Sequence, residues 1–214
     1  MENALNNLVR EGLVREGLIR EEHESYRIQP TTFRVMESFE DFVALNPELV
    51  VEQNSNGEIV ILSPAGSESA RRNVEISFQL QRWSKSYGGV TFDSSVLFTL
   101  PDGSKRGPDA SWIAADRWQA LSKEDREAFA PICPDFVIEL RSRTDRLVDL
   151  KQKMNDYMAN GVRLGWLIDP YTRQVFNYRE SCEMEVLPEN SPCSGEDVLP
   201  GFILELSPIW ADKK

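Results

Sequence analysis

A strand, a helix and a second strand follow one another within the chain, and this segment constrains the fold more than any other. Phe136–Leu140 is an apolar run with the length and composition of a buried strand. The helix that follows is expected to be capped by Thr144 or Asp145 and to end before Gly161. Arg163–Asp169 is the second strand-like run. A strand, a helix and a strand in this order are typical of a parallel crossover unit, so the segment predicts a sheet with parallel strands.

The other segments also mix helix and strand patterns. A Ser-capped helix is expected at residues 38–45, and Asn56-Gly57 predicts a tight hairpin between residues 49–52 and 58–62. Ser67–Tyr87 has one apolar face and ends at two glycines. The further elements expected are strands at 90–100 and 109–114, a polar helical insert at 116–129, and strands at 174–178, 183–187 and 202–206. The sequence predicts an α+β (α/β) fold in which helices flank a mixed β-sheet.

The first 30 residues differ from the rest. They contain a five-residue repeat, which begins at Leu8, Leu13 and Leu18. This period advances about 140° per repeat on a helix and alternates faces on a strand, so the apolar residues do not gather on one side. We expect residues 1–30 to be a frayed or loosely helical extension, with a partner-binding helix as the alternative, and residues 31–214 to form one domain.

The composition excludes several classes of protein. No apolar run approaches the ~20 residues of a membrane span, and the chain starts with charged residues, so a cytoplasmic protein is expected. The single histidine, His23, lies in the N-terminal extension, which argues against Ser-His-Asp, Cys-His and zinc-hydrolase chemistry. The three cysteines show no CxxC spacing and predict reduced thiols. Chemistry must therefore rely on carboxylates, lysine, arginine and hydroxyls.

Two acidic residues lie at the ends of strand-like runs. Asp109 follows Gly107-Pro108 at the start of one run, and Glu139 lies near the end of the run 136–140. A charge at Glu139 would be buried, which costs several kcal/mol unless a cation or strong donors compensate it. Two such acids at adjacent strand ends would bind a hard divalent metal. The alternatives are that Asp109 caps a turn and that Glu139 pairs with a neighbouring arginine.

Basic residues follow these acids despite a net charge of −11 for the whole chain. On the predicted helix, Lys153 and Lys151 border opposite edges of the apolar stripe, so each lies beside the buried face. The alternative for Lys153 is an exposed ion pair with Asp149, four residues earlier.

Two segments resemble the Uma-type endonuclease family, within the PD-(D/E)XK restriction-endonuclease-like superfamily. The resemblance covers about residues 31–210 and is most specific in Pro134-Asp135-Phe136-Val137-Ile138-Glu139-Leu140-Arg141-Ser142 and onward through Lys153 to Asp169-Pro170. Gly107-Pro108-Asp109 matches the first acid of the superfamily motif, and Glu139 matches the second.

This resemblance implies a site for magnesium or manganese, with Asp109, Glu139 and the carbonyl of Leu140 as ligands. Arg141 stands where the motif expects lysine, and a guanidinium that stays protonated is no general base, although it can stabilise negative charge. The family pattern suggests that Lys153 takes over the lysine's role beside the attacking water. The resemblance also suggests Glu75 as an additional carboxylate of the site. Its position off the apolar stripe of the helix instead favours a solvated side chain.

The function implied is metal-dependent endonuclease cleavage of DNA, with DNA as the partner and no membrane. A homodimer would suit double-strand cleavage, but no residue pattern indicates one. The main alternative is a catalytically weakened or inactive nuclease fold that binds nucleic acid or protein. A small-molecule hydrolase is a weaker alternative, since no glycine-rich phosphate loop is present.

Overall fold

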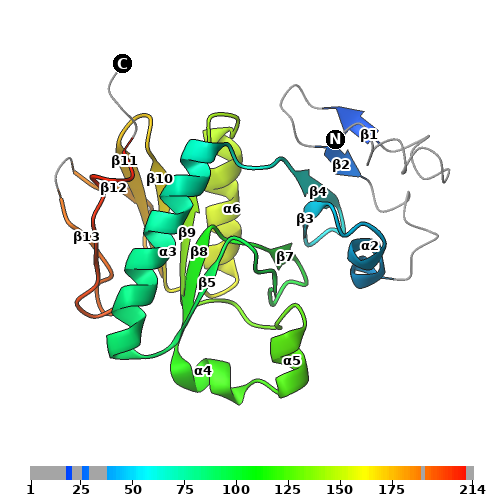
Figure 1. Cartoon of the computed structure of the whole chain (residues 1–214), viewed down its shortest axis with the longest axis horizontal. Helices are drawn as coiled ribbons and strands as arrows, with labels where there is room; N and C mark the ends of the chain where they lie inside the picture. The colour runs from blue at the N-terminus through cyan, green and yellow to red at the C-terminus, as the bar shows by residue number, and fades with distance from the viewer. Residues whose placement is uncertain (1–17, 21–25, 29–37, 189–190, 211–214) are drawn as a thin grey trace. The chain divides into compact units, whose positions relative to one another are not determined.

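The computed structural model describes residues 18–20, 26–28, 38–188 and 191–210 (Figure 1). The chain divides into two compact units. The smaller unit contains the described residues up to Pro64 together with Asp102–Arg106, and the larger contains Ala65–Pro101 with the described residues from Gly107 onward. This division runs through the segment 31–214, for which the sequence predicts one domain. The two units are described separately below.

The smaller unit is built on antiparallel strands. The predicted hairpin is confirmed as β3 (Val50–Gln53) and β4 (Ile59–Leu62), and the predicted helix is α2 (Phe39–Leu45), capped by the Ser38 side chain. Gly57 adopts a φ of +84° in the turn, which glycine accommodates without steric cost. β2 (Tyr26–Ile28) pairs with β4, β1 (Leu18–Arg20) pairs with β2, and β7 (Lys105–Arg106) pairs with β3.

These strands bear on the expectation for the N-terminal extension. The parts of it that the structure describes, β1 and β2, are strands and not helix. They extend the sheet edge that β4 offers, which the sequence pattern of the extension does not reveal. Its remaining residues lie outside the described residues, as does His23.

The larger unit is a six-stranded mixed sheet with a helix on each face. The strand order is β12-β11-β10-β9-β8-β5. The strands are β5 (Val90–Asp93), β8 (Ala110–Ile113), β9 (Phe136–Leu140), β10 (Leu164–Asp169), β11 (Gln174–Arg179) and β12 (Glu185–Val186). The predicted crossover is confirmed, because β9 and β10 are parallel and joined by α6 (Leu147–Ala159), while the other neighbours are antiparallel.

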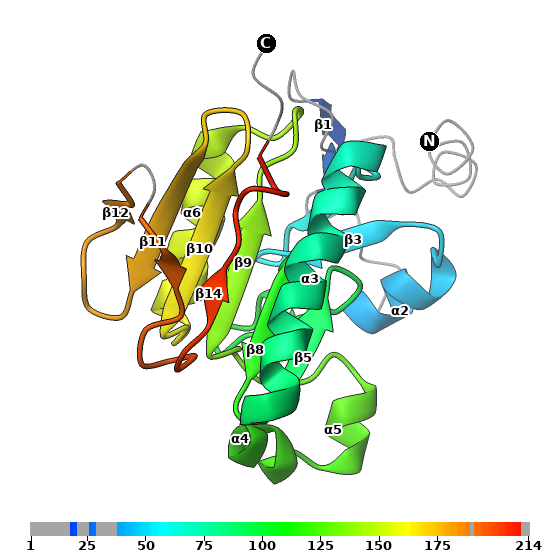
Figure 2. The same cartoon turned by 60° about the vertical axis from the view of Figure 1, so that its left-hand side comes forward.

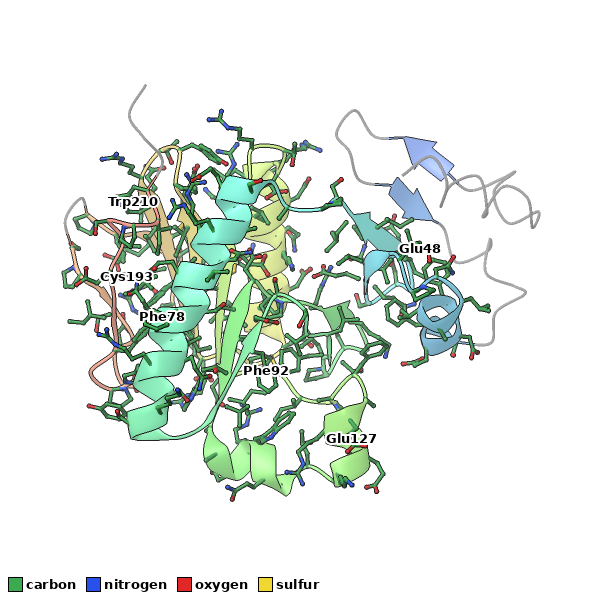
Figure 3. All side chains as sticks on the ribbon, in the orientation of Figure 1. Glu48, Phe78, Phe92, Glu127, Cys193 and Trp210 are labelled. Atoms are coloured by element: carbon green, nitrogen blue, oxygen red, sulfur yellow. The ribbon has the colours of Figure 1, made fainter. Side chains whose placement is uncertain are left out.

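Two apolar cores lie on opposite faces of this sheet. Figure 2 shows α3 (Ser67–Tyr87) in front of the sheet and α6 behind it. Successive residues of β9 alternate between the two cores, since Phe136, Ile138 and Leu140 pack on the α3 side and Val137 packs on the α6 side. Of the residues labelled in Figure 3, Phe92 packs against the α6-side core, whereas Cys193 is part of the α3-side core and Trp210 packs against it.

Four predicted elements differ from the structure. The run 90–100 is divided into β5 and β6 (Phe98–Thr99), because the Asp93 carboxylate accepts hydrogen bonds from the Ser95 N–H and hydroxyl and forms a turn. The helical insert is two short helices, α4 (Ala115–Ala120) and α5 (Lys123–Glu127), since Ser122 caps a new helix.

The third difference is the start of α6. Its N-cap is Arg146, without a side-chain cap, because the Asp145 carboxylate accepts from the Ser142 N–H instead. The fourth is at the C-terminal end. The strand predicted at 202–206 is β14 (Ile203–Leu204), which pairs with an unpredicted strand, β13 (Cys193–Ser194), and does not join the six-stranded sheet.

No helix among residues that the structure describes has the length and apolar character needed to cross a membrane. Cys133, Cys182 and Cys193 are free thiols, as the sequence predicts. Burial raises the pKa of the Cys193 thiol well above its ordinary value.

Candidate active site

Asp109 and Glu139 lie at the ends of neighbouring strands. β8 and β9 are antiparallel, and Ala110 pairs with Ile138. Asp109 immediately precedes β8, and its carboxylate accepts a hydrogen bond from the N–H of Leu140, the residue that follows Glu139. The topology thus brings together two acids that are 30 positions apart in the sequence.

Both oxygens of the Asp109 carboxylate accept hydrogen bonds. The Leu140 N–H donates to Oδ2 at 2.7 Å, and the Asn73 side-chain amide donates to Oδ1 at 2.8 Å. Burial nevertheless raises the pKa of Asp109 above its ordinary value. The bonds from Leu140 and Asn73 and the charge of Lys153 oppose this rise, and Asp145 adds to it. A bound cation would relieve the cost of this buried negative charge.

Glu139 is almost fully buried and pairs with a lysine. Its Oε1 lies 2.8 Å from the Lys153 Nζ and accepts a hydrogen bond from the Tyr157 hydroxyl at 3.2 Å. Only 4% of the Glu139 side chain and 15% of the Lys153 side chain are exposed. Glu139 and Lys153 thus form an ion pair with each other, and the Asp149 Oδ2 lies 3.9 Å from the Arg146 Nη1.

Lys153 also contacts the segment that carries the first acid. Its Nζ donates to the Gly107 carbonyl at 3.0 Å, two residues before Asp109. One ammonium group therefore binds both acidic segments. This is possible because α6 returns from the end of β9 along the face to which Glu139 projects. Lys151, at the opposite edge of the same helix, lies over the Phe176 ring at 4.3 Å.

Arg141 makes its contacts at the end of β10. Its Nη1 lies 2.9 Å from the Asp169 Oδ2, and its Nε donates to the Asp145 carbonyl at 3.2 Å. Burial alone would raise the pKa of Asp169, but hydrogen bonds from Arg141, Thr172 and Tyr171 outweigh it and hold that pKa below its ordinary value.

Glu75 binds within its own helix. Its Oε1 accepts from the Gln79 amide at 2.9 Å, and Gln79 also exchanges two hydrogen bonds with the backbone of Glu205. This network lies beside β14, whereas Asn73 makes the contact from α3 to Asp109.

Sequence reasoning missed three partners of the predicted site residues. Asn73 bonds to Asp109, Tyr157 to Glu139 and Asp169 to Arg141. A signal existed for two of them. Asn73 precedes the buried Ile76 by three residues, so it is a polar residue on the apolar face of α3. Tyr157 follows Lys153 by four residues on α6, which places the two side chains next to each other. The contact of Asp169 depends on the register of β10 against β9 and has no local signal.

The donor set fits a hard divalent cation. Among the described residues, no three His, Cys, Asp or Glu side chains cluster as a metal site. Asp109 and Glu139 offer two carboxylates to a cation, and the backbone carbonyl of Leu140 offers a neutral oxygen. Carboxylate and carbonyl oxygens are the ligands that magnesium and manganese prefer.

Comparison with known proteins identifies the family. A family model described as "Uma2: Putative restriction endonuclease" matches residues 36–207. The chain belongs to the Uma2 family. The family and the fold class predicted from the sequence are thus confirmed. Restriction-endonuclease-like proteins are hydrolases that generally use divalent metals.

A solved structure shares the fold of this chain. It is described as "a putative nuclease belonging to DUF820 from Anabaena variabilis", and it is similar to this chain with a TM-score of 0.64 and 20% sequence identity. The match covers 76% of this chain and 90% of that chain. At this identity the likeness shows the fold alone. A search of curated proteins finds no match.

Proposed function

We propose that the chain is a metal-dependent endonuclease that hydrolyses phosphodiester bonds in DNA. One observation carries the proposal: Lys153 bonds both to Glu139 and to the Gly107 carbonyl, so it lies between the two acidic segments. Uma2 membership supports this class of reaction, since the family model is described as "Putative restriction endonuclease".

Each group has a chemical role in this proposal. Asp109, Glu139 and the Leu140 carbonyl hold magnesium or manganese. The cation, when bound, neutralises phosphate charge and lowers the pKa of a coordinated water. Lys153 positions the attacking water and stabilises negative charge that develops on the phosphate. Tyr157 keeps the Glu139 carboxylate oriented through its hydroxyl.

Arg141 has a structural role in this proposal. Its guanidinium is held by Asp169 and by the Asp145 carbonyl, which fixes the loop between β9 and α6. Lys153 supplies the positive charge that the superfamily motif places two residues after its second acid, here Glu139.

Cleavage of supercoiled plasmid tests the proposal. The parent chain should nick or linearise the plasmid in magnesium or manganese and should stop when a chelator is added. Asp109→Asn and Glu139→Gln remove one ligand charge each with little change of shape, and each should lower the rate by ~100-fold or more. Glu75→Gln is the matched control, because this carboxylate is bonded to Gln79, and it should cleave at the parent rate.

Two results would contradict the proposal. Cleavage at the parent rate by either acid variant would move the site elsewhere. DNA binding that is equally strong with and without chelator, with no cleavage by the parent chain, would support the alternative of an interaction module.

A further inference from the structure

Of the two polar atoms of the Asn73 side chain, the nitrogen forms a hydrogen bond and the oxygen has no partner among the described residues. Its Nδ2 donates to the Asp109 Oδ1 at 2.8 Å. Its Oδ1 is buried and has no hydrogen-bond partner among the described residues. A buried acceptor without a partner costs about 1–3 kcal/mol, so such an atom in a native fold calls for an explanation.

Reversing the amide does not remove the problem. If the two ends of Asn73 were exchanged, its carbonyl oxygen would face the Asp109 carboxylate, and two acceptors would repel each other. The observed orientation is thus the favourable one. It leaves a neutral oxygen beside an amide nitrogen that is bonded to the first acid of the site.

A second buried asparagine shows what is particular to Asn73. The Asn177 Oδ1 likewise has no partner in the described part of the chain, and the Asn177 Nδ2 donates to the Glu196 Oε1 at 3.2 Å. Glu196, however, is already neutralised by Arg179 at 2.8 Å. Asp109 has no such ion pair within the described residues, and its carboxylate accepts only from the neutral Asn73 amide and the Leu140 N–H among the contacts described for it. The unsatisfied oxygen of Asn73 therefore lies next to a carboxylate whose charge lacks a direct counterion.

We propose that Asn73 is a positioning residue of the metal site, with its Nδ2 orienting Asp109 and its Oδ1 accepting a hydrogen bond from a water bound to the cation. This inference rests on the proposed function, because it needs a cation at Asp109. It adds a residue from α3 to a site otherwise built from β8, β9 and α6. Magnesium and manganese keep several waters in protein sites, and each such water needs acceptors for its hydrogens.

Calorimetric titration of the metal-free chain with Mn²⁺ tests this role without relying on cleavage. Asn73→Leu keeps the volume but removes both polar ends, and it should weaken Mn²⁺ binding by ~10–100-fold, the usual effect of losing a group that supports a metal ligand. Asn177→Leu is the matched control, since it removes the same groups beside Glu196, and it should leave Mn²⁺ affinity unchanged.

A second variant guards against a folding defect in the first. Asn73→Asp retains an oxygen and adds a negative charge, so it should bind Mn²⁺ at least as tightly as the parent while melting at a lower temperature without metal. Parent-like Mn²⁺ affinity in Asn73→Leu, or weaker Mn²⁺ binding in Asn73→Asp than in Asn73→Leu, would overturn the inference.

The outcomes separate this inference from the proposed function. If the parent binds Mn²⁺ and Asn73→Leu does not, but the parent cleaves no DNA, the nuclease proposal fails and the role of Asn73 stands. If the parent cleaves DNA and Asn73→Leu binds Mn²⁺ normally, only the role of Asn73 fails. If the parent binds no Mn²⁺, both fail.

Discussion

Lys153 and Lys151 are two residues apart on α6, yet their ammonium groups have different surroundings. Lys153 is bonded to a buried carboxylate and a backbone carbonyl, whereas Lys151 lies over the face of Phe176. The first contact fixes a charge beside the two acids. The second contributes only about 0.5–1 kcal/mol as a cation–π interaction at a partly exposed position.

Lys153→Met should lower the single-turnover rate of plasmid cleavage by ~100-fold or more, the effect expected of a positioned charged group, while Mn²⁺ affinity stays within a few-fold of the parent. The same change leaves Glu139 buried without its counterion, which should lower the free energy of unfolding by about 3–5 kcal/mol. Rates are therefore compared at a temperature well below the melting transition of each variant.

Two matched variants serve as controls for the rate measured with Lys153→Met. Lys151→Met keeps the aliphatic contact with Phe176 and should cleave at nearly the parent rate. Arg141→Lys should also remain active, because the hydrogen bonds described for Arg141 go to the Asp169 carboxylate and the Asp145 carbonyl. A lysine cannot form both of these bonds in the same way. Equal small losses for Lys153→Met and Lys151→Met would remove Lys153 from the proposed chemistry.

The Arg141–Asp169 pair should make stability depend on pH. The pKa of Asp169 is held below its ordinary value, so its ionised form stabilises the fold above the unfolded-state pKa of about 4, and this contribution is lost as pH falls through the folded-state pKa. Asp169→Asn should therefore lower the free energy of unfolding by about 1.5–3 kcal/mol at neutral pH. Urea unfolding of both proteins from about pH 7 to pH 3 measures the difference. A difference that stays constant over this range would contradict the assigned contact.

At the scale of residues, sequence reasoning finds the groups that strands and helices position by their own periodicity. Asp109, Glu139 and Lys153 can be proposed because strand ends and a helix edge place them near one another. The partners Asn73 and Asp169 are 36 and 28 residues away from the groups they bind, and only the packing of α3 and the register of β10 bring them close.

At the scale of elements, the sequence predicts the long, strongly patterned segments well. The helix at Ser67–Tyr87 and the parallel pair of β9 and β10 are found as expected. The errors occur where a single polar side chain decides a boundary, as Asp93 does between β5 and β6. β13 was missed because two residues carry no periodic signal.

The turn between α3 and β5 provides a test at this scale. Gly88 and Gly89 have φ values of +91° and +81°, so a side chain at either position strains the backbone by about 1–2 kcal/mol. A Cβ at Gly89 would also meet the Trp112 ring and lie 2.7 Å from the Ile113 carbonyl oxygen, whereas a Cβ at Gly88 meets nothing within 4 Å. Gly89→Ala should thus destabilise the fold by about 1–3 kcal/mol more than Gly88→Ala in thermal or urea unfolding. Equal losses would show that only backbone conformation matters at this turn.

At the scale of the whole molecule, every residue proposed for chemistry belongs to the larger unit. Asp109, Glu139, Leu140, Lys153 and Asn73 all lie in Ala65–Pro101 or beyond Gly107. The sequence does not predict the division at residue 64, because the smaller unit includes Asp102–Arg106, which joins it by strand pairing. Non-local pairing of this kind leaves no mark in local periodicity.

A variant that lacks residues 1–25 should keep the cleavage rate of the parent in magnesium, and its melting temperature should stay within about 2 °C of the parent's. The reason is that β1 is only three residues long and pairs with β2 alone among the described strands. A variant that lacks residues 1–28 is the matched comparison. It also removes β2, so the backbone groups of β4 lose the partners they have in the antiparallel pair from Tyr26 to Ile28, and its melting temperature should fall further. Calorimetry of the three proteins measures both effects. A large fall in the melting temperature on removal of residues 1–25 alone would show that the N-terminal extension stabilises the fold.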